Sequence, residues 1–549
     1  MIKTALISSL EKCFPDQQVE DFAPLKALSV LKNERFSVQL LHKSEPDHAG
    51  RAIVRIDGAL AKYATVRNVK CIPVDLAVFP GQFDDNYLRT EPGLYPDLLQ
   101  PLHYGGAISI MKDQTQSAWI EFDPDGAVDA GTYPMVVTLV DGLGNEVAKE
   151  SFEVTIVNAM LPEQTMRLTQ WFHCDCLANY YNVPAWSEEH WRIVENFART
   201  ARRNGINLLL TPIFTPALDT VIGGERTTVQ LVDVCKNGEE YTFGFDKLDR
   251  WIEMCNRVGI KYFEIAHLFT QWGAEHAPKV MATVDGEYKK IFGWETCATG
   301  DDYRTFLRTF LGAFLDHMKV RGDDKRCYFH ISDEPNETQL ESYKAAKAVV
   351  ADLLEGYPIM DALSNFEFFR QGIVPMPIPS NNHIEPFIDA KIDGLWTYYC
   401  CGQTVGVSNR MMSMPLWRTR SIGYQFYKYD IAGFLQWGYN FYNTCGSIDA
   451  INPYLDACGE YWVPAGDTYS VYPAQNGEAL ESIRILSFHE ALQDVRAMKV
   501  AEAFYGKDAV VAALEEILGE IHFDKCATDA QTILKMREKI NSMIMEAVK

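Results

Sequence analysis

The stretch Tyr328-Phe-His-Ile-Ser-Asp-Glu-Pro335 decides the predicted fold, because an apolar strand ends there in two adjacent carboxylates and a proline. It belongs to the fourth of eight short β-like segments that alternate with amphipathic helices after residue 160. The segments span residues 168–173, 207–211, 261–267, 327–332, 359–363, 392–398, 434–440 and 469–472. This alternation predicts a (β/α)8 barrel with insertions, one of which, residues 217–246, carries its own hairpin pattern.

The chain before residue 160 has a different pattern, in which apolar and polar residues alternate. In Arg51-Ala-Ile-Val-Arg-Ile-Asp57, alanine, valine and isoleucine share one face and the two arginines share the other. Such period-two alternation is typical of half-buried strands. The turn Asp141-Gly-Leu-Gly-Asn145 between two apolar runs predicts a hairpin. Several strands of this kind predict an antiparallel β-sandwich.

The change of pattern at Asn158-Ala-Met-Leu-Pro-Glu163 marks a linker. We therefore predict a multidomain protein. A β-sandwich domain is expected over 1–160, a catalytic barrel over 161–505 and a C-terminal helical extension over 506–549.

The composition limits the partners of this chain. Its 549 residues include 51 Lys and Arg against 74 Asp and Glu, for a net charge of −23. Such a surface repels nucleic acid and anionic lipid. The sequence contains no apolar run long enough to cross a bilayer and no convincing secretory leader. Thirteen scattered cysteines favour reduced thiols, so we expect a cytoplasmic protein. Whether it forms a homo-oligomer stays open.

Two acids stand where the barrel fold places active sites. Alternation puts His330, Ser332 and Glu334 on one side of the strand and starts Asp333 on the other. The chain turns at this point, since Pro335 restricts the residue before it to extended or turn conformations. Active sites of this fold lie at the carboxyl ends of the strands. We therefore predict Asp333 and Glu334 as catalytic carboxylates, rather than as solvated acids beside a helix N-terminus.

The first segment ends in a mixed cluster, Gln170-Trp-Phe-His-Cys-Asp-Cys176. His173 and Asp175 share a face that the two cysteines do not, and Cys-x2-Cys spacing is absent, so no metal site is predicted. His173 and Asp175 are candidate ligands of sugar hydroxyls or, alternatively, a structural pair. His330 is a further substrate-binding candidate, and His173, His330 or backbone donors are candidates for keeping Asp333 ionised.

Aromatic side chains at the ends of the later segments are candidates for stacking on a sugar ring, although each can equally belong to the core. They are Tyr398, Trp437 and Tyr472, and Asn440 lies beside them. Asp467 is interpreted either as a turn residue or as a ligand.

The missing second acid points to a mechanism. Most retaining glycosidases use two carboxylates about 5–5.5 Å apart, one of them a nucleophile. Many barrel glycosidases carry that nucleophile on strand seven, but residues 436–442 contain no acid. This absence favours substrate assistance, in which the 2-acetamido oxygen of the sugar attacks its own anomeric carbon.

The sequence resembles glycoside hydrolase family 123, a family of β-N-acetylgalactosaminidases, over nearly its whole length. Four motifs carry the resemblance: Trp171–Asp175 with Leu177, Tyr180 and Tyr181; His330–Pro335; Gly433–Asn440; and Pro464–Asp467 with Val471–Pro473. It implies that Asp333 orients the acetamido group and stabilises an oxazolinium, and that Glu334 is the general acid and then the base. Retention of configuration, an oligosaccharide or glycoconjugate substrate and the absence of any metal or organic cofactor are also implied.

Two alternatives stay open. One is a barrel glycosidase for a non-acetylated sugar, with a conventional nucleophile such as Asp175 or Asp467. The other is a sugar-binding barrel without catalytic activity.

Overall fold

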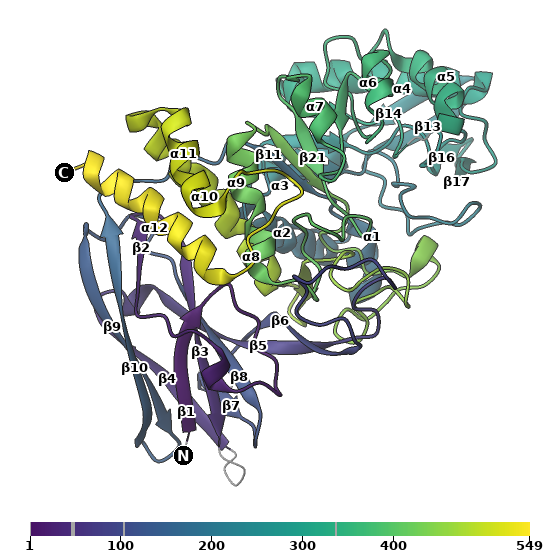
Figure 1. Cartoon of the computed structure of the whole chain (residues 1–549). Coiled ribbons are helices and arrows are strands. Elements are labelled where there is room, and N and C mark those ends of the chain that lie inside the picture. Colours follow the sequence, from purple (N-terminus) through teal and green to yellow (C-terminus); the bar gives the residue numbers. More distant parts are fainter. Residues whose placement is uncertain (1, 45–49, 103–104, 335–336) are drawn as a thin grey trace.

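The computed structural model describes residues 2–44, 50–102, 105–334 and 337–549. Ten strands near the N-terminus form two five-stranded sheets (Figure 1). The first sheet has the order β1 (Ile2–Ser8), β3 (Phe36–Ser44), β8 (Thr115–Phe122), β5 (Ala64–Val74) and β6 (Gly93–Pro101). The second has the order β2 (Ala27–Leu31), β10 (Glu146–Val157), β9 (Gly131–Asp141), β4 (Gly50–Asp57) and β7 (Ala107–Ile110).

The two sheets enclose one shared core. Val38 and Ile120 of the first sheet cluster with Val137 and Val154 of the second. The predicted hairpin is present as β9 and β10, which pair antiparallel. The prediction of a purely antiparallel region needs one correction, because β2 runs parallel to β10. Strand β2 reaches the sheet edge through the chain segment around Phe22, so no tight hairpin dictates its direction.

A set of parallel strands follows the linker. Its members in chain order are β11 (Arg167–Gln170), β12 (Leu208–Thr211), β15 (Tyr262–Ile265), β18 (Cys327–Phe329), β19 (Met360–Ala362), β20 (Met376–Ile378), β21 (Trp396–Tyr398) and β22 (Gly433–Gln436). Parallel ladders join β15 to β12 and β18, β19 to β20, and β22 to β21 and β11. Single parallel bridges, Phe329 to Ile359 and Ser380 to Tyr398, link these groups.

A helix follows each of these strands. The helices are α2 (Glu188–Arg203), α3 (Asp246–Val258), α4 (Asp301–Arg321), α5 (Leu340–Val350), α6 (Phe366–Arg370), α7 (Glu385–Asp389), the pair α8 (Leu416–Arg420) and α9 (Ile422–Lys428), and α10 (Ile483–Tyr505). A short extra helix, α1 (Cys174–Tyr181), lies between β11 and α2. The predicted hairpin in 217–246 is present as β13 (Asp233–Asn237) and β14 (Glu240–Gly244). It joins β16 (Val280–Val284) and β17 (Glu287–Phe292) in one sheet.

The strand prediction was wrong at two places. Residues 469–472 do not form the eighth parallel strand, because β23 (Val471–Pro473) pairs antiparallel with β24 (Ala479–Glu481). The missing parallel strand is β20, which the prediction overlooked. Prolines 375, 377 and 379 made β20 difficult to recognise as a strand, because proline has no backbone N–H to donate to a β-ladder. The strand instead offers carbonyls: Ile378 O accepts from Leu363 N and Pro379 O accepts from Tyr398 N.

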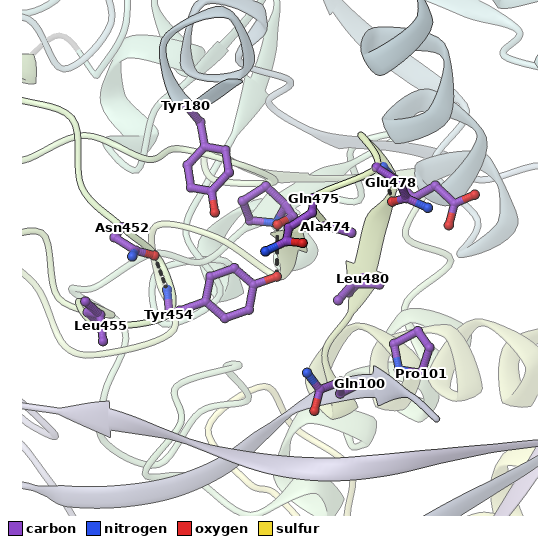
Figure 2. A pocket seen from close by; sticks show the side chains of 12 residues that line it. Gln100, Pro101, Tyr180, Asn452, Tyr454, Leu455, Ala474, Gln475, Glu478 and Leu480 are labelled. Atoms are coloured by element: carbon purple, nitrogen blue, oxygen red, sulfur yellow. Dashed lines mark hydrogen bonds between the residues drawn. The ribbon is translucent and has the colours of Figure 1, made fainter. Parts of the chain in front are cut away.

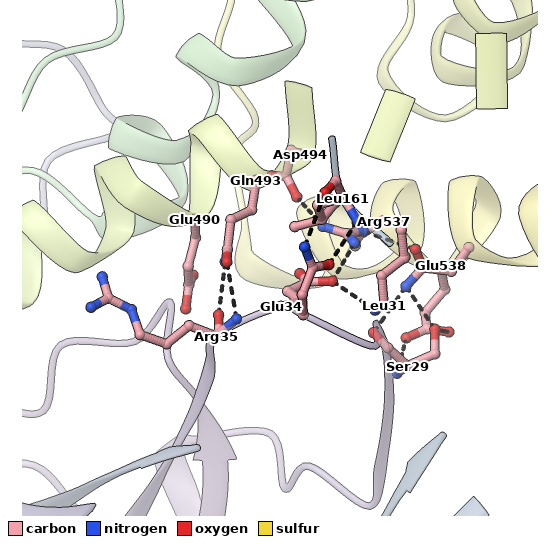
Figure 3. Close-up of polar contacts among 12 residues, drawn as sticks. Ser29, Leu31, Glu34, Arg35, Leu161, Glu490, Gln493, Asp494, Arg537 and Glu538 are labelled. Carbon is pink, nitrogen blue, oxygen red and sulfur yellow. Dashed lines mark hydrogen bonds and ion pairs between the residues drawn. The ribbon is translucent and has the colours of Figure 1, made fainter. Parts of the chain in front are cut away.

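The last helices pack against the N-terminal sheets. Figure 1 shows α10, α11 (Lys507–Leu518) and α12 (Ala530–Ala547) in yellow, with α12 across the end of the sheets next to β2. Arg537 of α12 pairs with Glu34, which precedes β3, at 2.6 Å and with Asp494 of α10 at 2.9 Å. Arg420 of α8 also binds Asp494, at 2.7 Å. We call this buried cluster of Glu34, Asp494, Arg420 and Arg537 the junction, and Figure 3 shows part of it.

Among the described residues, no helix combines the length and the apolar character that a membrane span requires.

Candidate active site

A cavity of about 190 Å³ lies where the parallel strands end. Trp171 follows β11, Ala362 and Tyr398 end β19 and β21, and Trp437 follows β22. The predicted acids Asp333 and Glu334, four and five residues beyond β18, line the same cavity. The remaining lining residues are Asp219, Trp272, Cys400, Cys401, Leu435, Trp462 and Val463. Two predicted catalytic and two predicted substrate-binding residues therefore meet in one small pocket.

Glu334 is held from across the cavity. The Tyr398 hydroxyl donates to Glu334 Oε1 at 2.5 Å. The backbone of Glu334 has a φ of +41°, a conformation that is uncommon outside glycine and often occurs at functional sites. The predicted turn is thus present at Glu334, while Pro335, to which the prediction assigned it, lies outside the described residues. This turn lets both neighbouring side chains face one pocket although they leave the strand on opposite sides.

The electrostatics of the cavity are unusual because its acids have no cationic neighbour on the pocket wall. Burial, followed by the negative charges of Glu334 and Asp219, raises the pKa of Asp333 well above its usual value. His330 opposes this shift. Burial and like charge therefore favour a protonated Asp333 in the free protein.

Asp219 is a cavity acid that sequence analysis missed. Burial raises its pKa to about 7, and Glu334 and Asp467 add to the shift, while Arg226 opposes it. Among the described residues, no hydrogen bond or ion pair engages its carboxylate. Its backbone is fixed instead, because its N–H donates to Gln271 Oε1 and its carbonyl accepts from Ser447 Oγ. Asp219 lies in the 217–246 insertion, where only a hairpin was predicted, and no strand end marked it.

His330 lies beneath the cavity rather than on its wall. It is 1% exposed, and its two ring nitrogens contact Glu264 at 2.7 Å and Asp361 at 3.2 Å. Although burial disfavours the charged ring, these two carboxylates raise the pKa of His330 to about 10. The two carboxylates therefore favour the imidazolium form of His330. His330 does not line the cavity, and its expected role in substrate binding stays a prediction.

One group of side chains has metal-ligand geometry. Ligand atoms of His267, His330 and Asp361 lie within 4.8 Å of one another. However, a protonated His330 with both N–H groups bonded to carboxylates offers no lone pair to a metal. These residues therefore fit an ion-pair network better than a metal centre.

His173, Asp175 and Asn440 lie behind the cavity wall, and all three are buried. Arg226 binds both oxygens of Asp175 at 2.7 Å and donates to His173 Nδ1 at 3.0 Å. The other nitrogen, His173 Nε2, lies 2.9 Å from Trp437 O, and burial lowers the pKa of His173 to about 3. Asn440 exchanges hydrogen bonds with the His173 backbone. None of the three lines the cavity, and their role in substrate binding stays a prediction.

Trp437 and Asp467 form a pair at the cavity. Asp467 Oδ2 accepts from the Trp437 indole N–H at 2.8 Å and from Cys401 N at 3.0 Å, and Oδ1 accepts from Gln436 at 3.0 Å. Burial raises the pKa of Asp467 to about 6 against the opposing effect of Arg410. The structure therefore places Asp467 as the residue that orients the Trp437 ring.

Tyr472 is the one predicted residue that lies in another part of the molecule. Its hydroxyl donates to Asp97 of β6, whose carboxylate also binds Arg484 at 2.7 and 2.9 Å. Tyr472 is fully buried and does not line the cavity. This position follows from the corrected strand pairing, because β23 extends toward the N-terminal sheets.

Comparisons with known proteins agree with this arrangement. The family model described as glycoside hydrolase 123, catalytic domain, matches residues 171–501. A family 123 glycoside hydrolase from Clostridium perfringens, studied for glycolipid glycan hydrolysis, has a similar fold with a TM-score of 0.74 at 13% identity. That match covers 99% of this chain and 97% of the other.

More distant structures include a β-glucuronidase from Parabacteroides merdae, with a TM-score of 0.30 and 9% identity over 90% of this chain and 52% of that one. An endo-β-1,4-mannanase from Thermotoga petrophila has a TM-score of 0.32 and 11% identity over 62% and 78%. Both are too dissimilar to inform on this site. Among curated proteins, none matches this sequence.

Proposed function

Because the chain belongs to the glycoside hydrolase 123 family and is a glycoside hydrolase, we propose that it releases terminal β-linked N-acetylgalactosamine or a related N-acetylhexosamine. The proposed mechanism is substrate assistance through an oxazolinium intermediate. The observation that carries the proposal is the adjacent pair Asp333 and Glu334 in one small cavity with tryptophan rings. Its volume suits a single terminal sugar residue better than the interior of a long chain.

The two acids have separate tasks in this mechanism. The acetamido oxygen attacks the anomeric carbon while the bond from that carbon to the leaving oxygen breaks. Glu334 donates its proton to the leaving oxygen, and the carboxylate of Asp333 accepts the acetamido N–H and balances the positive charge of the ring that forms. Glu334 then removes a proton from water. The water attacks the anomeric carbon of the oxazolinium from the face that the leaving group occupied, which opens the ring and gives net retention.

This division of work requires an ionised Asp333 when substrate is bound. An acetamido N–H bonds more strongly to an ionised carboxylate than to a protonated one, so substrate binding favours the ionised form of Asp333. His330 opposes protonation of Asp333 from below the cavity. Tyr398 is proposed to position Glu334, and Trp171, Trp437 and Trp462 to enclose the acetamido methyl group.

We further propose that the eight parallel strands close into a (β/α)8 barrel that makes up most of 161–505, with 1–160 and 506–549 as its flanking units. The chain order of the ladders and the helix after each strand support this proposal. The position of the cavity at the carboxyl ends of the strands also agrees with it.

Asp219 supports a second candidate mechanism. It supplies the additional cavity acid that a conventional retaining enzyme acting on a non-acetylated sugar needs, with Asp219 as nucleophile and Glu334 as acid. The earlier candidates for this role are less suitable, since Asp175 is neutralised by Arg226 and Asp467 holds Trp437.

An activity panel separates the two mechanisms. Aryl β-glycosides with and without a 2-acetamido group are assayed with the wild type and with Asp333→Ala, Glu334→Gln and Asp219→Asn. Substrate assistance predicts turnover only of acetamido substrates and its loss in Asp333→Ala. It also predicts that Glu334→Gln spares activated aryl leaving groups relative to alkyl ones. Turnover that survives in Asp333→Ala but is lost in Asp219→Asn would establish the conventional route instead.

A further inference from the structure

A second cavity, of about 720 Å³, is several times larger than the catalytic one. It opens between strand β6, helix α1, the loop around Tyr454 and the β23–β24 hairpin (Figure 2). Its volume falls within the range of about 300–1,000 Å³ that is usual for ligand pockets. Its lining residues are Gln100, Pro101, Tyr180, Asn452, Tyr454, Leu455, Pro473, Ala474, Gln475, Asn476, Glu478 and Leu480.

Two tyrosine rings are held in this cavity before any ligand binds. The Tyr454 hydroxyl donates to Pro473 O at 2.9 Å, and its ring packs on Tyr472 at 5.6 Å. Tyr180 of α1 packs edge-to-face on Tyr181 at 5.1 Å, and Figure 2 shows its ring directed toward that of Tyr454. The Tyr180 hydroxyl has no hydrogen-bond partner among the described residues. The cavity thus offers apolar ring surface together with an unused hydroxyl.

The polar lining consists of amides and one carboxylate. The side chains of Gln100, Gln475 and Glu478 form no hydrogen bond or ion pair with another described residue. Asn452 uses only its Oδ1, which accepts from Tyr454 N at 3.0 Å, and keeps its amide N–H groups free. The lining contains no Lys, Arg or His. Within the described lining, a phosphorylated or carboxylated ligand would therefore meet Glu478, whose electrostatic partner Arg192 lies outside that lining.

This cavity is separate from the catalytic one, because the two share no lining residue. A buried cluster of rings lies behind Tyr454: Tyr472 packs on Tyr469 at 5.3 Å, and Tyr469 packs on Tyr442 at 5.6 Å. The hairpin that forms part of the wall is anchored on its far side, where Asn196 donates to Gly477 O at 3.1 Å.

We propose that this second cavity is an accessory binding site for a neutral oligosaccharide. The apolar faces of pyranose rings pack on aromatic side chains, and their hydroxyls donate to amide oxygens and carboxylates and accept from amide N–H groups. Tyr180 and Tyr454 supply the first kind of surface, and Gln100, Gln475 and Glu478 supply the second. The site would hold a neutral glycan region remote from the bond that is cleaved, so its existence does not depend on the proposed catalytic mechanism.

Binding without turnover tests the proposal. Lactose, N,N′-diacetylchitobiose and maltotriose are titrated by saturation-transfer NMR and calorimetry into protein whose catalytic cavity is filled with a thiazoline analogue of N-acetylgalactosamine. At least one of these sugars should bind under this block. Sialyllactose should bind more weakly than lactose, since its carboxylate meets Glu478.

Two variants assign the binding to this cavity. Tyr180→Leu keeps apolar bulk but loses the aromatic face, and Gln475→Ala alters only an exposed side chain that should not affect folding. Each should weaken binding by about tenfold while hydrolysis of an aryl glycoside stays at the wild-type rate. If no probe binds, if the thiazoline competes with them all, or if neither variant changes the affinity, the proposal is overturned. Asp333→Ala should lose hydrolysis but still bind the oligosaccharide in the second cavity. This result would show that the binding proposal does not depend on the catalytic one.

Discussion

The acids of the catalytic cavity and the acids of the junction are placed in opposite surroundings. At the junction, Asp494 lies between Arg420 and Arg537, both within 2.9 Å. In the cavity, Asp333, Glu334 and Asp219 share a wall without any cationic side chain. Both groups are carboxylates enclosed by protein, and only their neighbours differ.

The pKa values show the consequence. Burial by itself would raise the pKa of Asp494, but the two guanidinium groups hold it below its usual value. With no such partner, burial and like charge raise the pKa of Asp219 to about 7. Removing the partner of a buried, paired acid destabilises a fold, whereas acids left without counter-charge keep protons available for transfer. The comparison therefore separates paired structural carboxylates from the proposed catalytic ones.

The largest effect is expected from Asp333→Asn. Turnover of aryl N-acetyl-β-galactosaminides should fall by about 10²- to 10⁴-fold, because an amide cannot balance the oxazolinium charge. The free energy of unfolding in urea at neutral pH should not decrease, since no ion pair is lost. A marked loss of stability would place Asp333 with the junction acids and break the comparison.

Arg537→Met should have the converse effect. It removes the cation that pairs with the buried Glu34 and one of the two that pair with Asp494, which should cost about 3–5 kcal/mol of stability. Urea unfolding measures this loss, and activity per folded molecule should stay unchanged. Arg199→Met is the matched control, because Arg199 pairs with Glu195 at 2.9 Å on an exposed helix face, where such a pair contributes about 0.3–0.5 kcal/mol. Equal losses of stability in both variants would contradict the assignment of Arg537 to a structural role at the junction.

Tyr398→Phe sharpens the cavity side of the comparison. It removes the hydroxyl that donates to Glu334, and hydrogen bonds to charged groups contribute about 1.5–3 kcal/mol, so kcat should fall by about tenfold to a hundredfold. Tyr399→Phe is the control, since the neighbouring Tyr399 hydroxyl is buried without a hydrogen-bond partner in the described part of the chain. If the two substitutions reduce kcat equally, the contact with Glu334 is not important for catalysis.

The smallest effect concerns pH. The folded pKa of Asp219, about 7, exceeds its ordinary value of 3.8, so the folded state binds the proton more tightly than the unfolded state. Asp219 therefore reduces stability as pH rises from about 4 through 7. Asp219→Asn removes this penalty and should raise Tm by a few degrees at about pH 8 relative to wild type, with little change at about pH 4. A Tm difference that is independent of pH would argue against the raised pKa.

The position of Asp333 and Glu334 in the cavity could be predicted because its signal is local. The apolar strand followed by Asp333 and Glu334 can be recognised from consecutive residues alone. In a parallel fold this is enough to place the two acids at a strand end, whichever strands lie beside it. Tyr398 and Trp437 were accessible for the same reason, since each stands at or just beyond a strand end. A strand end was not sufficient, because His173, Asp175 and Asn440 follow such ends and lie behind the cavity wall. Asp219 was missed because no strand end marks it, and Tyr472 was misplaced because the pairing of its segment was predicted wrongly.

The sequence by itself determined most of the succession of elements, the family and the candidate acid pair, because hydrophobic periodicity and strand ends are properties of neighbouring residues. Only the tertiary structure decided which acids stay free of counter-charge. Asp175 meets Arg226, 51 positions away, and Asp494 meets Arg537, 43 positions away, while Asp333 meets no cation on the cavity wall. Counter-charges reach a carboxylate through space rather than along the chain, so the division between structural and catalytic acids becomes visible only once the chain has folded.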